Sequence, residues 1–220
     1  YSAEKCTYDK VDYDQIVHLI KEAKKPLILA GYGVRSGNAV DELQELCKKI
    51  HTPVVLSRGG IDVLASDSEW YIGRPGAYGD RASHFAVQQC DLLLILGSRL
   101  SVSTIGYYPQ RLAEKAVKIM VDIDPKELQK EDVPVDYKFH IDVKEFIGSL
   151  TVNLQDEEID SHDEWVKYCR EMKEKYPNVK AKYQKEIPLN EYWVTKKLSD
   201  LVGRDANIIV DTGSVCNIVS

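Results

Sequence analysis

The sequence predicts an α/β fold in which helices cover both faces of a parallel β-sheet, and three observations lead to this prediction. Short apolar segments alternate with amphipathic ones from residue 13 to residue 150, which is typical of repeated β-α-β units. Two of the apolar segments are unbroken and end at a glycine, Gly31 or Gly97, as buried parallel strands do. Of the 220 residues, 44% are hydrophobic and 29% are charged, which is ordinary for a globular protein.

Five segments within this region are predicted to be strands, because each is a short run dominated by apolar residues. They are Leu27–Ala30, Pro53–Leu56, Asp91–Leu96, Val117–Asp122 and Tyr137–Ile141. Apolar residues at helical spacing predict helices at 13–24, 39–50, 82–89 and 142–150.

Two further local predictions concern the segments around these helices. Asn38 is predicted to cap the helix at 39–50, because an asparagine side chain can accept hydrogen bonds from the first free N–H groups of a helix. Residues 58–79 are rich in glycine and are predicted to form a loop.

The pattern changes after Leu150. Residues 151–163 are polar and acidic, as expected of a linker. The remaining predicted elements are helices at 164–176 and 190–202, the strand Asn207–Val210 and the loop Asp211–Ser214. We therefore expect a first domain over 1–150, a linker and helix over 151–189, and the beginning of another α/β domain over 190–220. Because a predicted strand lies close to the last residue, we expect the chain to be a fragment of a longer polypeptide.

Composition argues against several classes of function. The chain has 29 Lys and Arg against 35 Asp and Glu, a net charge of −6, whereas nucleic-acid binders carry basic patches. No apolar run approaches the roughly 18 residues of a membrane span, and the polar first residues do not resemble a signal peptide. The five cysteines are scattered and none forms a C-x-x-C pair, so we expect neither disulfides nor zinc and place the protein in the cytoplasm.

Candidate binding residues follow the predicted strands, because ligands of parallel sheets bind beyond the carboxyl ends of the strands. Gly31–Ser36 is close to the dinucleotide motif G-x-G-x-x-G, but Ser36 replaces the last glycine. No acidic residue follows the second strand, whose end reads Ser57–Gly60. The glycines either admit a phosphate or only permit a tight turn.

Three other strand ends or loops also allow two interpretations each. The glycines of Gly73–Arg81 can wrap a ligand or form an irregular turn. Arg99 can bind a phosphate or an aromatic plane, or form a surface salt bridge. We interpret Asp122 as a ligand contact and Asp124 as the cap of a turn at Pro125.

No catalytic group is evident in the sequence. G-x-S-x-G, Walker A and H-E-x-x-H motifs are all absent. These features are more typical of a domain that holds a cofactor or has a structural role than of a complete active site.

Taken in order, these segments resemble the central domain of thiamine-diphosphate-dependent enzymes of the acetolactate synthase type. The residues that carry the resemblance are Pro26–Gly31 with Gly33, Thr52–Val55, Gly79 with Arg81–Ala82, Cys90–Leu100, Val121–Asp124 and Ile141–Val143. It covers about residues 11–150. Residues 190–220 are similar to the start of that family's third domain, which binds the diphosphate. Asp211–Gly213 stands where the family has Asp-x-Gly after the first strand of that domain.

The resemblance implies a Rossmann-like parallel six-stranded sheet flanked by helices, similar to that of deoxyhypusine synthase. It implies a parent enzyme that uses thiamine diphosphate and magnesium to decarboxylate pyruvate or another 2-oxo acid and to join the product to an acceptor. Such parents are usually homo-oligomers. The family's activating Glu and its metal motif, G-D-G followed by N-N, do not occur here, so the resemblance implies that this piece is inactive alone.

In the synthases the central domain binds FAD. Carried over residue by residue, the cofactor contacts are Gly31, Gly33, Ser57, Gly73, Gly76, Gly97, Arg99, Asp122 and Asp142, with Gly213 for the diphosphate of thiamine. Two departures bear on FAD. Ser103 stands where the synthase pattern has a flavin-contacting Arg, and Gly73–Gly76 reads Gly-Arg-Pro-Gly instead of Gly-Met-His-Gly. Some members with these features use other acceptors, such as a sugar or another aldehyde, and others keep the domain as a scaffold without a ligand.

Two alternatives belong to other classes of function. One is a stand-alone domain that binds NAD or another nucleotide. The other is a non-catalytic interaction module, in which Trp165 and Trp193 would be exposed anchors for a partner.

Overall fold

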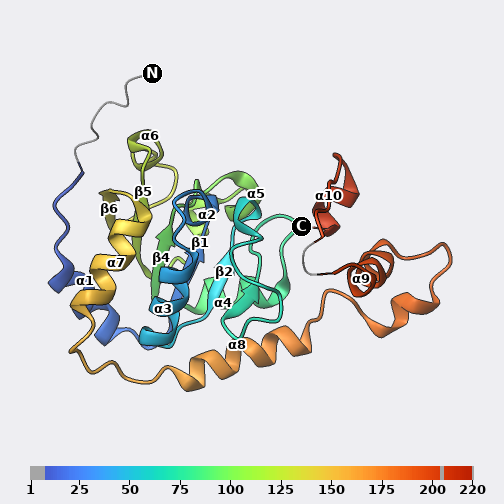
Figure 1. The fold of residues 1–220 in the computed structure, drawn as a ribbon, viewed down its shortest axis with the longest axis horizontal. Coiled ribbons are helices and arrows are strands. Elements are labelled where there is room, and N and C mark those ends of the chain that lie inside the picture. The colour runs from blue at the N-terminus through green and yellow to red at the C-terminus, as the bar shows by residue number, and fades with distance from the viewer. Residues whose placement is uncertain (1–7, 204–205, 220) are drawn as a thin grey trace. The chain divides into compact units, whose positions relative to one another are not determined.

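The structure is a computed structural model that describes residues 8–203 and 206–219. Its centre is a six-stranded, entirely parallel sheet in the order β3-β2-β1-β4-β5-β6 (Figure 1). The strands are β1 (Pro26–Ala30), β2 (Val54–Leu56), β3 (Tyr71–Gly73), β4 (Leu92–Leu96), β5 (Val117–Asp122) and β6 (Tyr137–His140). This is a Rossmann-like sheet, so the predicted fold class is confirmed.

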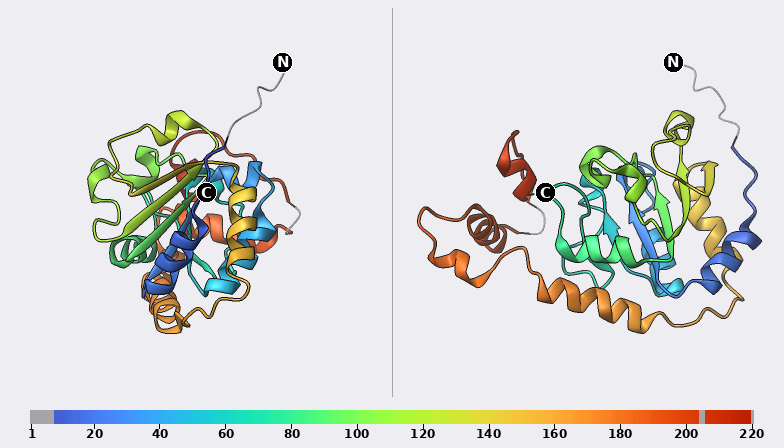
Figure 2. Two further views of the ribbon diagram at one scale, coloured as in Figure 1. Left: turned by 90° about the vertical axis from the view of Figure 1, so that its left-hand side faces the viewer. Right: turned by 180° about the vertical axis from the view of Figure 1, so that it is seen from behind.

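Helices cover both faces of this sheet, as Figure 2 shows from two further sides. One apolar layer lies between the sheet and α1 (Tyr13–Glu22), α3 (Val40–Ile50) and α7 (Val143–Asn153). The other includes residues of α4 (Arg81–Gln89), α6 (Pro125–Leu128) and α8 (Asp163–Lys175). Along β1, Ile28 faces the first layer while Leu27 and Leu29 face the second, because successive side chains of a strand point to opposite faces.

Short helical segments occupy the connections between these elements. They are α2 (Tyr32–Ser36), η1 (Arg58–Gly60), α5 (Val102–Ile105) and η2 (Pro109–Arg111). Three of the four, α2, η1 and α5, directly follow or nearly follow the carboxyl end of a strand.

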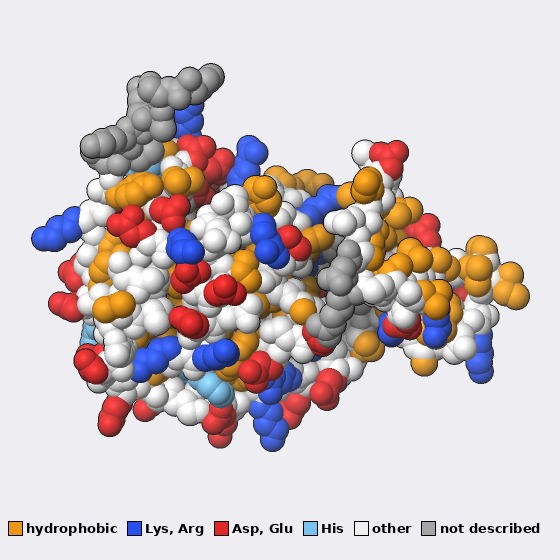
Figure 3. Space-filling model, in the orientation of Figure 1, with side chains coloured by type: hydrophobic (Ala, Val, Ile, Leu, Met, Phe, Trp, Pro, Cys, Tyr) orange, Lys and Arg blue, Asp and Glu red, His pale blue; other side chains and the backbone are white. Residues whose placement is uncertain are grey.

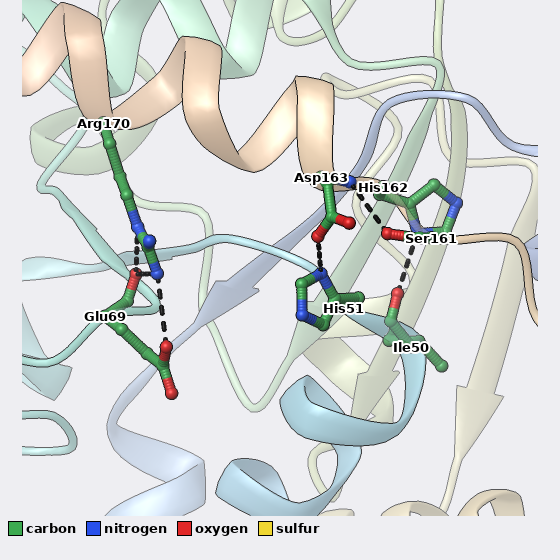
Figure 4. Close-up of polar contacts among 7 residues, drawn as sticks. All are labelled: Ile50, His51, Glu69, Ser161, His162, Asp163 and Arg170. Carbon is green, nitrogen blue, oxygen red and sulfur yellow. Dashed lines mark hydrogen bonds and ion pairs between the residues drawn. The ribbon is translucent and has the colours of Figure 1, made fainter.

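Helix α8 packs along the amino-terminal edge of the sheet. Figure 4 shows His162, just before α8, with Nδ1 2.8 Å from the carbonyl oxygen of Ile50, and Arg170 beside Glu69. The other ring nitrogen of His162 lies 3.1 Å from the carbonyl oxygen of Ala23. Because these partners precede β2, β3 and β1, the helix is anchored at the edge opposite to the carboxyl ends of the strands.

Two tryptophans were expected to be exposed in an interaction module, and for Trp165 this expectation is wrong. Its side chain is buried, only 4% exposed, and its Nε1 donates a hydrogen bond of 2.8 Å to the carbonyl oxygen of Pro26. The amphipathic pattern of α8 therefore serves the core. Trp193 is half-buried within α9.

The described residues form two compact units, the first up to Lys173 and the second from Glu174. The second contains η3 (Ala181–Lys185), α9 (Glu191–Leu201) and α10 (Ser214–Val219). The predicted helix at 190–202 is confirmed, and Asn190 caps it by accepting from the N–H groups of Tyr192 and Trp193.

Three local predictions are wrong. Residues 207–210 form no strand, because no neighbouring strand pairs with them in the described part of the chain. Within 58–79, Tyr71–Gly73 forms the edge strand β3 by pairing with β2, although three residues are too few to give a pattern. Asn38 does not cap α3; it has a left-handed φ of 51°, and Ala39 occupies the cap position.

Charged side chains of both signs are interspersed on the face of the molecule in Figure 3. Within residues 8–203 and 206–219, none of the helices combines the length and the hydrophobicity that a membrane span needs.

Candidate functional site

A cleft of about 710 Å³, here called the carboxyl-edge cleft, lies beyond the carboxyl ends of β1, β2, β4 and β5. The register of the sheet explains its position, because Ala30 pairs with both Leu56 and Leu96, and Leu96 pairs with Val121. The next residues of these four strands therefore lie at one level, at the carboxyl edge of the sheet. They are Gly31, Ser57, Gly97 and Asp122, all of which the sequence singled out.

The cleft lies at the switch point of the sheet, between β1 and β4. From β1 the chain continues to β2 on one side, and from β4 it continues to β5 on the other. Five predicted residues line it. They are Gly33, Ser57, Gly97, Arg99 and Asp122. Gly31 is buried beneath the turn that begins α2 and is not among the lining residues.

The glycines at this point bring two backbone turns into direct contact. A β-carbon on Gly31 would lie 2.2 Å from the carbonyl oxygen of Gly97, and one on Gly33 would lie 2.6 Å from the Cα of Gly97. Gly97 itself has a φ of 57°, which favours glycine. The geometry therefore requires glycine at these positions for the tight turn.

Ser98 is a cleft residue that the sequence did not single out. It is only 1% exposed, it lines the cleft, and its Oγ has no hydrogen-bond partner within the described part of the chain. A buried hydroxyl without a partner is costly and uncommon in folded proteins. A polar ligand in the cleft can supply the missing hydrogen bond.

Arg99 forms the surface ion pair that was one of its two interpretations, and it also lies at the cleft. Its Nε lies 3.3 Å from Oε1 of Glu127, and its side chain is 77% exposed. Arg58 adds a second guanidinium to the lining, and Tyr32 adds an exposed aromatic ring that no sequence motif indicated.

The acidic side of the cleft begins at Asp122. This residue is 9% exposed, and its Oδ1 accepts a hydrogen bond of 2.9 Å from the backbone N–H of Asp124. Burial raises the pKa of Asp122, and the nearby carboxylates of Glu127 and Asp124 add to that effect. Asp124 caps α6 by accepting from the N–H of Lys126 at 2.9 Å, so its predicted cap is confirmed.

Asp142 faces a second, smaller cavity of about 120 Å³. Gly33, Gly97 and Asp122 line this cavity as well, so it adjoins the carboxyl-edge cleft. The Oδ1 of Asp142 accepts from the N–H groups of Lys144 and Glu145 and so caps α7. The structure thus brings Asp142 together with the predicted residues of the cleft.

Besides Gly31, three predicted residues lie outside both cavities. Gly73, with a φ of 146°, closes β3 against the side chain of Asp80. Gly76 lines a separate groove of about 280 Å³, where its N–H donates to Nε2 of His84 at 3.1 Å. Gly213 belongs to the second unit, and its φ is 108°.

The groove at Gly76 and the carboxyl-edge cleft share Thr104 of α5. Ser103, on the cleft side, is hydrogen-bonded to Ser101 with 2.8 Å between the two hydroxyl oxygens. Across residues 8–203 and 206–219, no group of three or more His, Cys, Asp or Glu side chains is arranged to hold a metal ion. The cleft thus offers cations, hydroxyls and carboxylates suited to a polar organic ligand.

Comparison with known proteins identifies relatives of this chain. A family model described as "Thiamine pyrophosphate enzyme, central domain" matches residues 13–150. The large subunit of acetolactate synthase isozyme 2 from Escherichia coli is 26% identical over 94% of this chain and 36% of its own length.

Two other relatives carry similar names. The acetolactate synthase large subunit of Corynebacterium glutamicum is 31% identical over 88% of this chain and 31% of its own length. The probable acetolactate synthase large subunit of Methanocaldococcus jannaschii is 33% identical over 70% of this chain and 26% of its own length. The chain therefore spans about a third or less of the length of these relatives.

Proposed function

The chain belongs to the thiamine pyrophosphate enzyme family through its central domain, and on this basis we propose that it is part of an acetolactate synthase-like enzyme. The whole enzyme would use thiamine diphosphate and magnesium to decarboxylate pyruvate or another 2-oxo acid and to join the product to an acceptor. The names of the relatives support this reaction class. Like its family, the whole protein is expected to be a homo-oligomer.

Within that enzyme, we propose that residues 13–150 hold the nucleotide portion of FAD in the carboxyl-edge cleft. The single observation that carries this proposal is the unpartnered Oγ of Ser98, buried in the wall of a polar cleft at the switch point of the sheet. A volume of about 710 Å³ lies within the usual range for small-molecule sites, roughly 300–1,000 Å³. The residues present therefore fit such a group.

The polar residues of the cleft suggest how the nucleotide would lie. The guanidinium groups of Arg58 and Arg99 suit the diphosphate, because arginine matches the geometry of phosphate oxygens. The carboxylate of Asp122 can accept hydrogen bonds from ribose hydroxyls. Ser103 offers only a short hydroxyl toward the flavin half, so most of the affinity is expected from the adenosine diphosphate half.

Thiamine diphosphate and magnesium are proposed for the whole enzyme and not for this chain alone. The sequence contains neither G-D-G nor N-N, and the described residues present no set of metal ligands. Gly213 remains a proposed diphosphate contact in the second unit. We accordingly expect residues 1–220 alone to catalyse no reaction.

We also propose that the protein is located in the cytoplasm. Cys47, Cys90 and Cys169 are buried free thiols. Burial raises the pKa of Cys90 and Cys169 to about 12, so both stay protonated and unreactive, as suits core residues of a reduced protein.

A thermal-shift titration of the intact protein tests the nucleotide site. FAD is expected to raise the unfolding temperature and NAD is not, and ADP is expected to give most of the FAD effect. Arg99→Ala is expected to abolish the rise, because it removes the diphosphate partner. Arg170→Ala is the matched control, since it removes a guanidinium from the opposite edge of the sheet.

Three results would count against the proposal. An FAD-induced rise that persists in Arg99→Ala would move the site away from the cleft. Stabilisation by NAD instead of FAD would favour the stand-alone nucleotide-binding alternative, and the absence of any rise would favour a scaffold without a ligand.

A further inference from the structure

Glu127 holds one edge of the guanidinium that we assign to the diphosphate. Nε of Arg99 lies 3.3 Å from Oε1 of Glu127. The other oxygen, Oε2, forms an ion pair with Nζ of Lys130. That Nζ also lies 3.5 Å from the backbone carbonyl oxygen of Arg99. The three side chains and the backbone of Arg99 thus form a closed ring of contacts.

The Glu127 carboxylate is the least exposed of the three side chains in this ring. The side chain of Glu127 is 15% exposed, whereas those of Lys130 and Arg99 are 38% and 77% exposed. Glu127 lies in α6, which is fixed at its start by the cap of Asp124 and in the core by buried Leu128. A long, exposed arginine side chain is therefore tethered to a short element of the fold.

This tether leaves the other edge of the guanidinium available. The contact with Glu127 is made through Nε, and within the described residues neither Nη atom donates a hydrogen bond to the protein. Arg99 and Glu127 both line the carboxyl-edge cleft. The Nη edge is the planar fork that binds two phosphate oxygens at once.

We propose that Glu127 is a positioning residue, which orients Arg99 so that its Nη edge receives the diphosphate of a nucleotide. This inference rests on the proposed function of the cleft. Glu127 forms an ion pair with Nε at 3.3 Å and touches no phosphate itself. By restricting Arg99 before the ligand arrives, it lowers the entropy that binding must remove from that side chain.

The opposite effect is physically conceivable, because a carboxylate beside the site repels an anionic ligand. The two effects differ in what they require of residue 127. Positioning needs an oxygen at the end of the side chain that can contact Nε, which glutamine keeps. Repulsion needs the negative charge, which glutamine and alanine both remove.

Titration calorimetry of the intact protein with ADP separates these cases. Glu127→Gln is expected to bind ADP at least as tightly as the unsubstituted protein. Glu127→Ala is expected to bind about two- to tenfold more weakly than Glu127→Gln, the cost of ordering one free side chain. Glu131→Ala, an exposed acid in the same segment, measures the effect of losing one nearby charge.

The same pair of substitutions is then made in Arg99→Ala, where there is no guanidinium to orient, at ADP concentrations high enough to titrate the weakened site. In that background, Glu127→Gln and Glu127→Ala are expected to bind ADP with equal affinity. A double-mutant cycle gives this result when Glu127 acts directly through Arg99. A merely structural role of Glu127 would leave the difference between the two variants intact. If Glu127→Ala is not recovered folded, Glu127→Asp replaces it, because one methylene less withdraws the carboxylate from Nε.

The outcomes are distinguishable. Equal affinities of Glu127→Gln and Glu127→Ala, or a difference that survives in Arg99→Ala, would overturn the positioning role while leaving the nucleotide site intact. Failure of the unsubstituted protein to bind either ADP or FAD would overturn the proposed function, and the role of Glu127 with it.

Discussion

Asp122 places a negative charge in a poorly solvated position at the rim of the cleft. Burial raises the pKa of its carboxyl, so folding favours the neutral form. A group of this kind destabilises the fold when it is ionised. A carboxylate in such a position beside a cleft suits ligand binding, because an ionised acceptor forms a strong hydrogen bond with a ligand hydroxyl.

We predict that Asp122→Asn makes the intact protein more stable and a weaker nucleotide binder. The amide oxygen can still accept from the N–H of Asp124, while the buried charge is gone. FAD affinity should fall about ten- to a hundredfold, because a hydrogen bond to a charged group is lost. Thermal unfolding and calorimetry measure the two effects, with exposed Asp132→Asn as the control.

The sign of the pH dependence follows from the raised pKa. The stability of the unsubstituted protein relative to Asp122→Asn is highest below the ordinary pKa of about 4 and falls as the pH rises through the raised value. The gain in stability from Asp122→Asn should therefore be small at acidic pH and largest at neutral pH. A gain that is greatest at acidic pH, or an unchanged FAD affinity at neutral pH, would refute this account of Asp122.

Some site residues could be predicted from the sequence and others could not, for a physical reason. Gly97 and Arg99 follow a strand, and Asp122 ends one, that is recognisable from its own apolar residues, and parallel strands end at one edge. Ser98 and Glu127 matter because of what surrounds them in three dimensions. The orphaned hydroxyl of Ser98 and the contact between Glu127 and Arg99 leave no pattern along the chain.

Among the elements, α8 has the clearest structural role. It is held at the amino-terminal edge by His162, Arg170 and Trp165. The Trp165 ring also stacks on Tyr168, with ring centroids 5.6 Å apart. Because the cleft lies at the opposite edge, α8 is expected to affect stability without contributing a ligand contact.

We predict that Trp165→Ala destabilises the first unit by about 3–5 kcal/mol, the usual cost of removing a buried Trp side chain. Chemical denaturation of the intact protein, followed by far-UV circular dichroism, measures this loss. Trp193→Ala is the matched control, because it makes the same substitution in the second unit and should leave the unfolding of the first unchanged. A loss below about 1 kcal/mol for Trp165→Ala would show that α8 does not stabilise the sheet.

Strands were predicted correctly where burial produces a continuous apolar run. They were predicted wrongly where pairing with a neighbouring strand decides whether a segment is a strand. The apolar runs of β1 and β4 are central strands and were recognisable. Tyr71–Gly73 becomes a strand only because β2 lies beside it, and the equally apolar residues 207–210 find no such neighbour among the described residues. The left-handed backbone of Asn38 is likewise set by the turn between α2 and α3.

At the scale of the whole molecule, the chain combines a family-defining domain with a short second unit. The match to the central domain covers residues 13–150, and the relatives are about three times as long. The proposed carboligation therefore belongs to the whole enzyme. The part that can be argued from this chain is the nucleotide site at the carboxyl edge of the sheet.

The most direct test of that site is to identify the nucleotide that the intact protein carries. The protein is purified without added cofactor, denatured, and the released small molecules are separated and identified by mass. We predict FAD in near-stoichiometric amount, and its loss in Arg99→Ala. Protein that is folded yet releases no nucleotide and takes up none when FAD is added would contradict the central claim.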